Sequence, residues 1–169
     1  MRHSPAPALY PPVPTHRPIL AQALTSAFVV RQGLGEDWTR IPMPRILLWN
    51  TAVLLASSIA LESARKTREG KWLTVTLALG LLFLAGQMVG WRQLFGLGVY
   101  LSTNPHSSFF YVLTGVHALH LAGGLLSLAW VRLMREGDRR RARWLDSTAL
   151  YWHGMDILWI YLLLLLLRS

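Results

Sequence analysis

Residues 107–131 read SSFFYVLTGVHALHLAGGLLSLAWV, an uninterrupted run without a single Asp, Glu, Lys or Arg. An α-helix rises about 1.5 Å per residue, so about 20 apolar residues cross the hydrocarbon layer of a bilayer. The run is therefore long enough to form one transmembrane helix. Two histidines, His117 and His120, lie three residues apart inside it.

Other apolar runs lie on both sides of this one. Three have membrane-spanning length, and a fourth is shorter; they are Arg45–Ala64, Trp72–Trp91, Ser147–Leu167 and the short Ile19–Val30. The chain starts with MRHSPAPALYPPVPTHRP, whose six prolines disfavour a helix. We therefore predict an all-α, polytopic transmembrane helical bundle of about five helices, the first one short. It forms one domain over residues 18–169, behind a disordered Pro-rich tail over residues 1–17.

Composition supports a membrane protein and excludes several kinds of chemistry. Hydrophobic residues make up 53% of the chain and charged residues only 15%, which is unusual for a soluble domain. The absence of cysteine excludes disulfides, thiolate metal sites, iron–sulfur clusters and cysteine nucleophiles. No nucleophile with a base, phosphate-binding loop or dinucleotide fingerprint is present, so we predict no catalytic residue in this chain.

The net charge of +9 is explained by membrane topology, not by nucleic-acid binding. Two links between apolar runs, ARKTREGK (64–71) and RLMREGDRRRAR (132–143), are rich in Lys and Arg, whereas RQLFGLGVYLSTNPH (92–106) holds one arginine and no lysine. The positive-inside rule places both basic links in the cytoplasm and the C-terminus outside. The chain has five spans if residues 19–30 cross and four if they do not. Lipid head groups are expected to meet residues 132–143.

Polar side chains at membrane depth are the candidates for a functional role, because an unpaired one costs a few kcal/mol. They are Asn50, Ser57, Ser58, Glu62, Gln87, Thr114, His117, His120, His153 and Asp156. One hypothesis is that the histidines and Asp156 hold a metal ion or a haem. The other is that neutral histidines hydrogen-bond across helices and stabilise the bundle. We favour the second, since small residues surround His120 and leave little room for a porphyrin.

Three further positions have two interpretations each. Glu62 precedes Arg65 and Lys66 at the end of its run, which favours an arginine partner over a proton-relay carboxylate. Gln87 lies between Gly86 and Gly90, a spacing of small residues typical of helix packing. Trp91 is interpreted as an interface anchor or a core residue.

Four blocks of the sequence together resemble subunit III of the haem–copper oxidases, the cytochrome c oxidase and quinol oxidase family. They are NTAVLLASS (50–58), GQMVGW (86–91), SSFFYVLTGVHALHLAGG (107–124) and YWHGMDILWIYLLLLLL (151–167), in the family's order. The resemblance implies an accessory, non-redox subunit of the bacterial cytoplasmic (inner) membrane that supports oxygen reduction and proton pumping. It implies docking on oxidase subunits I and II, which carry the haem and copper. It also implies bound phospholipid and no cofactor, metal or nucleic acid in this chain.

In light of the resemblance, the candidate residues fall into two groups. The candidates for an internal polar or proton-handling network are Glu62, His117, His120, His153 and Asp156. The candidates for close helix packing or a lipid cleft are Gly86, Gln87, Trp91, Gly115, Gly123 and Gly124. The chain departs from the family's pattern in the short run 19–30 and in Gly154, where an aromatic residue is usual.

Alternatives from other classes remain at this point. One is an accessory subunit of a nitric oxide reductase, which would share the four blocks. Another is a free-standing haem or metal membrane protein. A transporter is disfavoured because no internal repeat or paired broken helices are visible.

Overall fold

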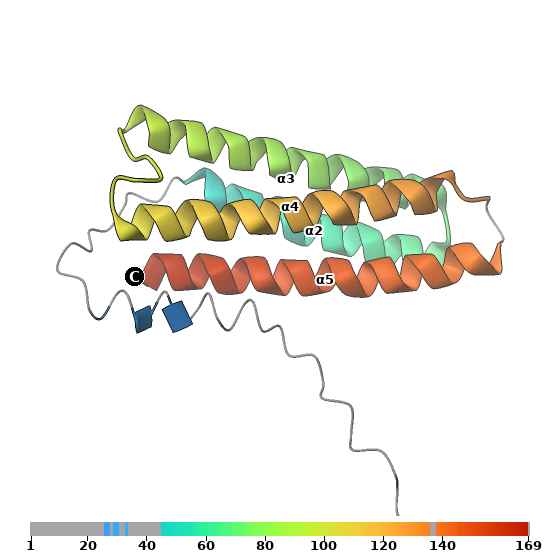
Figure 1. The fold of residues 1–169 in the computed structure, drawn as a ribbon. Helices are drawn as coiled ribbons and strands as arrows, with labels where there is room; N and C mark the ends of the chain where they lie inside the picture. The colour runs from blue at the N-terminus through green and yellow to red at the C-terminus, as the bar shows by residue number, and fades with distance from the viewer. Residues whose placement is uncertain (1–25, 28, 31–32, 34–44, 136–137, 169) are drawn as a thin grey trace, which may run out of the picture. The chain divides into compact units, whose positions relative to one another are not determined.

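The computed structural model describes residues 26–27, 29–30, 33, 45–135 and 138–168. Over residues 45–135 and 138–168 it consists of four helices and no strand (Figure 1). The helices are α2 (Ile46–Thr67), α3 (Gly70–Gly96), α4 (Pro105–Leu133) and α5 (Arg139–Arg168). Each is long and apolar enough to cross a membrane, so the prediction of an all-α membrane bundle with four strong spans is confirmed.

The predicted first helix, residues 19–30, lies mostly outside the described residues. Its described residues Ser26, Ala27, Val29 and Val30 are helical. They belong to a unit, Met1–Leu34, that is separate from Gly35–Ser169. The count of five helices and the tail over residues 1–17 therefore stay predictions.

The four helices run antiparallel and form a closed ring, in which α2 contacts α3 and α5, and α4 also contacts α3 and α5 (Figure 1). Each helix turns one stripe of its surface to the common centre. The largest fully buried side chains there include Trp152, Trp159, Phe83 and Phe110. A membrane supplies no hydrophobic driving force between helices, so this close packing and the hydrogen bonds across it hold the bundle together.

Local sequence explains where the helices begin and end. At the end of α2, Arg68 adopts a left-handed backbone conformation (φ 60°) and its N–H donates to the carbonyl of Ala64. Only Arg68 and Glu69 separate α2 from α3. Lys71 pairs with Glu69 at 2.9 Å and holds the pKa of this exposed carboxyl below its usual range. The turn is therefore tight, and its one carboxylate is paired.

The start of α4 is fixed by a capping box. The Asn104 side chain accepts a hydrogen bond from the Ser107 N–H at 2.8 Å, and the Ser107 hydroxyl accepts one from the Asn104 N–H at 3.2 Å. Pro105 occupies the first turn, where its missing N–H costs nothing. The helix thus begins two residues before the predicted span.

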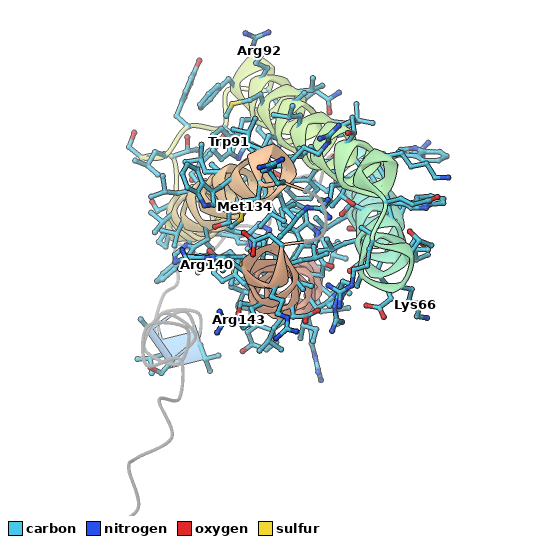
Figure 2. The ribbon with its side chains drawn as sticks, turned by 90° about the vertical axis from the view of Figure 1, so that its right-hand side faces the viewer. Lys66, Trp91, Arg92, Met134, Arg140 and Arg143 are labelled. Carbon is cyan, nitrogen blue, oxygen red and sulfur yellow. The ribbon has the colours of Figure 1, made fainter. Side chains whose placement is uncertain are left out.

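We call the end of the bundle that holds the α2–α3 turn and the start of α5 the basic end; it faces the viewer in Figure 2, where Lys66, Arg140 and Arg143 are labelled. The sequence predicts a link over residues 132–143, but α5 already begins at Arg139. Arg141 is 4% exposed and points inward instead of toward lipid head groups. Its guanidinium donates to the carbonyls of Val131 (3.4 Å) and Arg68 (3.3 Å). It therefore ties the end of α4 to the α2–α3 turn.

Candidate functional site

A chain of polar side chains runs between α2 and α5, starting at the basic end. Arg65 of α2 donates to Asp146 of α5 (Nε to Oδ1, 3.1 Å). It also donates to Glu62, which lies one turn earlier in α2 (NH1 to Oε2, 2.9 Å). These side chains are about one third to one half exposed. Glu62 thus has the arginine partner that one of its two interpretations required.

Deeper in the bundle, this series of contacting polar side chains continues through three more residues. His153 Nε2 lies 4.0 Å from Glu62 Oε2, and His153 Nδ1 lies 2.6 Å from the Ser58 hydroxyl. The Ser58 hydroxyl donates a short hydrogen bond to Asp156 Oδ2. The second oxygen of Asp156, Oδ1, is buried and has no hydrogen-bond partner among the described residues. We call these six residues, Asp146, Arg65, Glu62, His153, Ser58 and Asp156, the α2–α5 polar chain.

Helix geometry explains why these residues share one interface. On α2, Ser58, Glu62 and Arg65 are spaced by four and three residues, which places them on one face. On α5, His153 and Asp156 are three residues apart on one face. Asp146 and Asp156 are separated by about 15 Å along the helix axis, close to half the thickness of a hydrocarbon layer. Side-chain exposure falls along the same path, from 46% at Asp146 to 6% at Asp156.

His117 lies elsewhere, in the centre of the bundle. Its ring is 1% exposed and packs against Phe83 of α3 (5.9 Å between ring centroids) and Trp159 of α5 (5.0 Å). Neither ring nitrogen has a hydrogen-bond partner within the described part of the chain. The structure does not place His117 in the α2–α5 polar chain.

His120, one turn further along α4, points outward. Its Nδ1 donates to the carbonyl of Val116 at 2.8 Å, and its own carbonyl accepts from the Tyr151 hydroxyl at 2.9 Å. Both side chains are exposed on the outside of the bundle. Gly123 lies on the same outer surface, and a Cβ added there would meet nothing within 4 Å.

The remaining packing candidates lie at helix contacts. A Cβ on Gly86 would lie 2.0 Å from Asn50 Oδ1 of α2, and a Cβ on Gly124 would lie 3.2 Å from atoms of Trp152 and Tyr151. Gln87 is fully buried, with no partner for its amide among the described residues. Both glycines therefore mark close approaches between neighbouring helices.

Trp91 lies between α3 and α4 and links them by a hydrogen bond from its indole N–H to the Thr114 hydroxyl at 3.2 Å. Its ring also approaches Gly115, where an added Cβ would be 3.9 Å away. Trp91 thus connects α3 to α4 and also lies near the end of α3.

The histidines considered as metal or haem ligands do not converge. His117 faces the core, His120 faces outward, and His153 faces α2. Over residues 45–135 and 138–168 no group of three or more His, Asp or Glu side chains could hold a metal ion.

Sequence reasoning missed several hydrogen bonds that cross the bundle. Buried tryptophans donate to hydroxyls on α2: Trp152 to Ser57 at 3.0 Å and Trp159 to Thr51 at 3.0 Å. The pairing of Arg65 with Asp146 was also missed. A usable signal existed, since Thr51 and Ser57 lie within the apolar run of α2, where a hydroxyl needs a donor or acceptor.

Comparison with known proteins identifies the family. The family model for cytochrome c oxidase subunit III matches residues 18–168. Cytochrome c oxidase subunit 3 of Synechocystis sp. is 34% identical over 84% of this chain and 66% of the relative, and that of Thermostichus vulcanus is 31% identical over 85% and 77%. The cytochrome bo(3) ubiquinol oxidase subunit 3 of Pseudomonas aeruginosa is 33% identical over 75% and 64%.

The chain spans slightly less than two thirds of the length of the Synechocystis and Pseudomonas relatives. The matched region nevertheless includes all four described helices, with the α2–α5 polar chain. With its membrane-spanning helices and the match over residues 18–168, this chain is an integral membrane protein that belongs to the cytochrome c oxidase subunit III family.

Proposed function

We propose that this chain is the accessory, non-redox subunit III of a respiratory haem–copper terminal oxidase. The observation that carries the proposal is the family match over residues 18–168. Its relatives are named for a cytochrome c oxidase and for a ubiquinol oxidase. Haem and copper belong to the partner subunits I and II. This subunit supports oxygen reduction and proton pumping by the catalytic subunit.

The proposed topology places the basic end in the cytoplasm of a bacterium and the C-terminus outside. In support, the α2–α3 turn and the start of α5 lie at the same end of the bundle and carry Lys66, Arg68, Lys71 and Arg139–Arg143. The opposite link, residues 97–104, carries no charged side chain. Residues 19–30 form a fifth, short helix in this proposal. Arg140, Arg143, Trp144 and Ser147 line one hollow at the basic end that suits a phospholipid head group.

The bundle offers two different outer surfaces. In the middle of α2 (residues 48–59) and α3 (residues 75–89) every exposed residue is Ala, Val, Leu, Ile, Met or Trp. The exposed residues of α4 and α5 include the apolar Leu119, Leu126, Leu150 and Ile157, but His120 and Tyr151 add polar groups, and Gly123 and Gly154 add positions without a side chain. We call these four residues, His120, Gly123, Tyr151 and Gly154, the α4–α5 outer face. The Nε2 of His120 makes no hydrogen bond within the described residues.

We propose that the α4–α5 outer face contacts a transmembrane helix of the catalytic subunit. Polar groups exposed to hydrocarbon cost free energy, whereas contacts between membrane helices are rich in small residues and hydrogen bonds. An added Cβ on Gly123 or Gly154 would meet nothing within 4 Å, so a partner backbone can approach there. The exposed surfaces of α2 and α3 face lipid in this arrangement.

Deletion of the gene tests the proposed function, with complementation by the intact chain. The expected result is that membranes keep the haem bands of the oxidase but lose sustained oxygen turnover, and that the intact chain restores it. Loss of the haem bands themselves would instead show that the haem-bearing subunits do not accumulate without this chain, which would contradict a role limited to sustaining turnover. Unchanged turnover would contradict the supporting role.

The docking face is tested by site-directed photo-cross-linking. Because the chain has no cysteine, a thiol-reactive probe attaches only at an introduced one. Gly123→Cys should cross-link to the catalytic subunit, and the matched control Ala85→Cys on the exposed surface of α3 should react with lipid. Cross-linking to the catalytic subunit from Ala85→Cys alone would contradict the proposed docking face.

A further inference from the structure

We propose that the α2–α5 polar chain transfers protons between the basic end and the buried carboxylate of Asp156, with Ser58 as the bridge from His153. The inference extends the proposed supporting function by assigning a proton-exchange route to this subunit. It is carried by the contacts of Ser58, which touches both ionisable groups: His153 Nδ1 at 2.6 Å and Asp156 Oδ2 through a short hydrogen bond.

The directions of these hydrogen bonds follow from the chemistry of the three groups. An ionised carboxylate only accepts, so the Ser58 hydroxyl donates its proton to Asp156 Oδ2. The Ser58 oxygen is then left to accept, and His153 must donate from Nδ1. A neutral imidazole with a proton on Nδ1 has a free lone pair on Nε2. This lone pair faces Glu62 Oε2 at 4.0 Å.

A proton therefore has a complete path from Glu62 to Asp156. The partly exposed Glu62 carboxylate first takes up a proton from water at the basic end. After a small rotation closes the 4.0 Å gap, Glu62 gives this proton to His153 Nε2. The Nδ1 proton passes to Ser58 Oγ as the Ser58 hydroxyl proton passes to Asp156 Oδ2. Glu62 has then lost one proton and Asp156 has gained one. Ser58 and His153 keep their proton counts, and His153 changes from its Nδ1–H to its Nε2–H tautomer.

The surroundings give the path a direction. At its outer end, Arg65 pairs with both Glu62 and Asp146, and these three side chains are partly exposed at the basic end. At its inner end, Asp156 is 4% exposed, and its Oδ1 has no partner among the described residues. From α4, the titratable side chain of His117 packs on Trp159 of α5, one turn beyond Asp156. The described contacts thus lead to Asp156 from the basic end.

Hydrogen–deuterium exchange of Asp156, followed by infrared spectroscopy of the full chain in lipid nanodiscs, tests the route. The carbonyl band of the protonated acid is assigned by its loss in Asp156→Asn. Exchange of this band after transfer to D₂O should slow about a hundredfold in Ser58→Ala, because the positioned hydroxyl is gone. Ser58→Thr keeps the hydroxyl and should restore the rate.

A second variant separates the route from a packing effect. His153→Gln can still donate a hydrogen bond to Ser58 but cannot accept a proton at one atom and release one from another, so it should slow exchange as Ser58→Ala does. Exchange at the native rate in Ser58→Ala or in His153→Gln would overturn the proposal. It would also be overturned if, from acidic to alkaline pH, the native chain showed no carbonyl band that Asp156→Asn lacks. Co-purification of Ser58→Ala with oxidase subunits is measured in parallel, because it tests the proposed function independently of the route.

Discussion

Gly86 is the position where a single added carbon should disturb the bundle most. A Cβ there would lie 2.0 Å from Asn50 Oδ1, 2.9 Å from Asn50 Cγ and 3.0 Å from Asn50 Nδ2, so the Asn50 side chain must move. Asn50 is 3% exposed and donates to the carbonyl of Phe83 at 3.4 Å. In Gly86→Ala, overpacking costs about 1–3 kcal/mol, and loss of the Asn50 hydrogen bond costs about 1 kcal/mol more.

The matched control is Gly123→Ala, because its added Cβ meets nothing within 4 Å. Both substitutions change the intrinsic helix propensity by the same amount, so their difference isolates the clash with Asn50. We expect the free energy of unfolding of Gly86→Ala, measured by reversible denaturation in bicelles, to be about 2–4 kcal/mol below that of Gly123→Ala. Equal stability of the two variants would refute the close α2–α3 contact.

Other substitutions test the hydrogen bonds that hold the helices. Trp152→Phe removes the indole donor to the buried Ser57 hydroxyl and should lower the free energy of unfolding by about 1–3 kcal/mol. The control Trp144→Phe, on the exposed surface, should change this free energy little. Equal effects of the two substitutions in the bicelle assay would contradict the Trp152–Ser57 contact. Asn104→Ala removes the cap of α4 and should cost about 1 kcal/mol, with faster amide hydrogen exchange near Ser107; unchanged exchange there would argue against the capping box.

The four long helices could be predicted from sequence because each apolar run has membrane length and the basic links separate them. The precise ends could not, because they depend on local geometry that apolar composition does not encode. Arg139 to Arg143 are strongly polar, yet they extend α5 beyond the apolar run. The left-handed Arg68, which ends α2, is another example.

The candidate site was only partly predictable for a similar reason. The three-residue spacing of His153 and Asp156 is enough to place both side chains on one face of a helix. That spacing does not define the rotation of α5 about its own axis, so it could not reveal that Ser58 of α2 lies between them. The rotation of α4 about its own axis was likewise undefined, so the sequence could not show that His117 points inward while His120, three residues later, points outward.

Affinity purification of this chain from its native membranes in mild detergent, with mass spectrometry and a reduced-minus-oxidised optical spectrum, tests the central claim most directly. The account predicts that haem-bearing oxidase subunits I and II co-purify and carry the haem bands. Co-purification with a nitric oxide reductase would assign the chain to a different complex. Isolation of the chain alone with a haem or metal of its own would contradict the account.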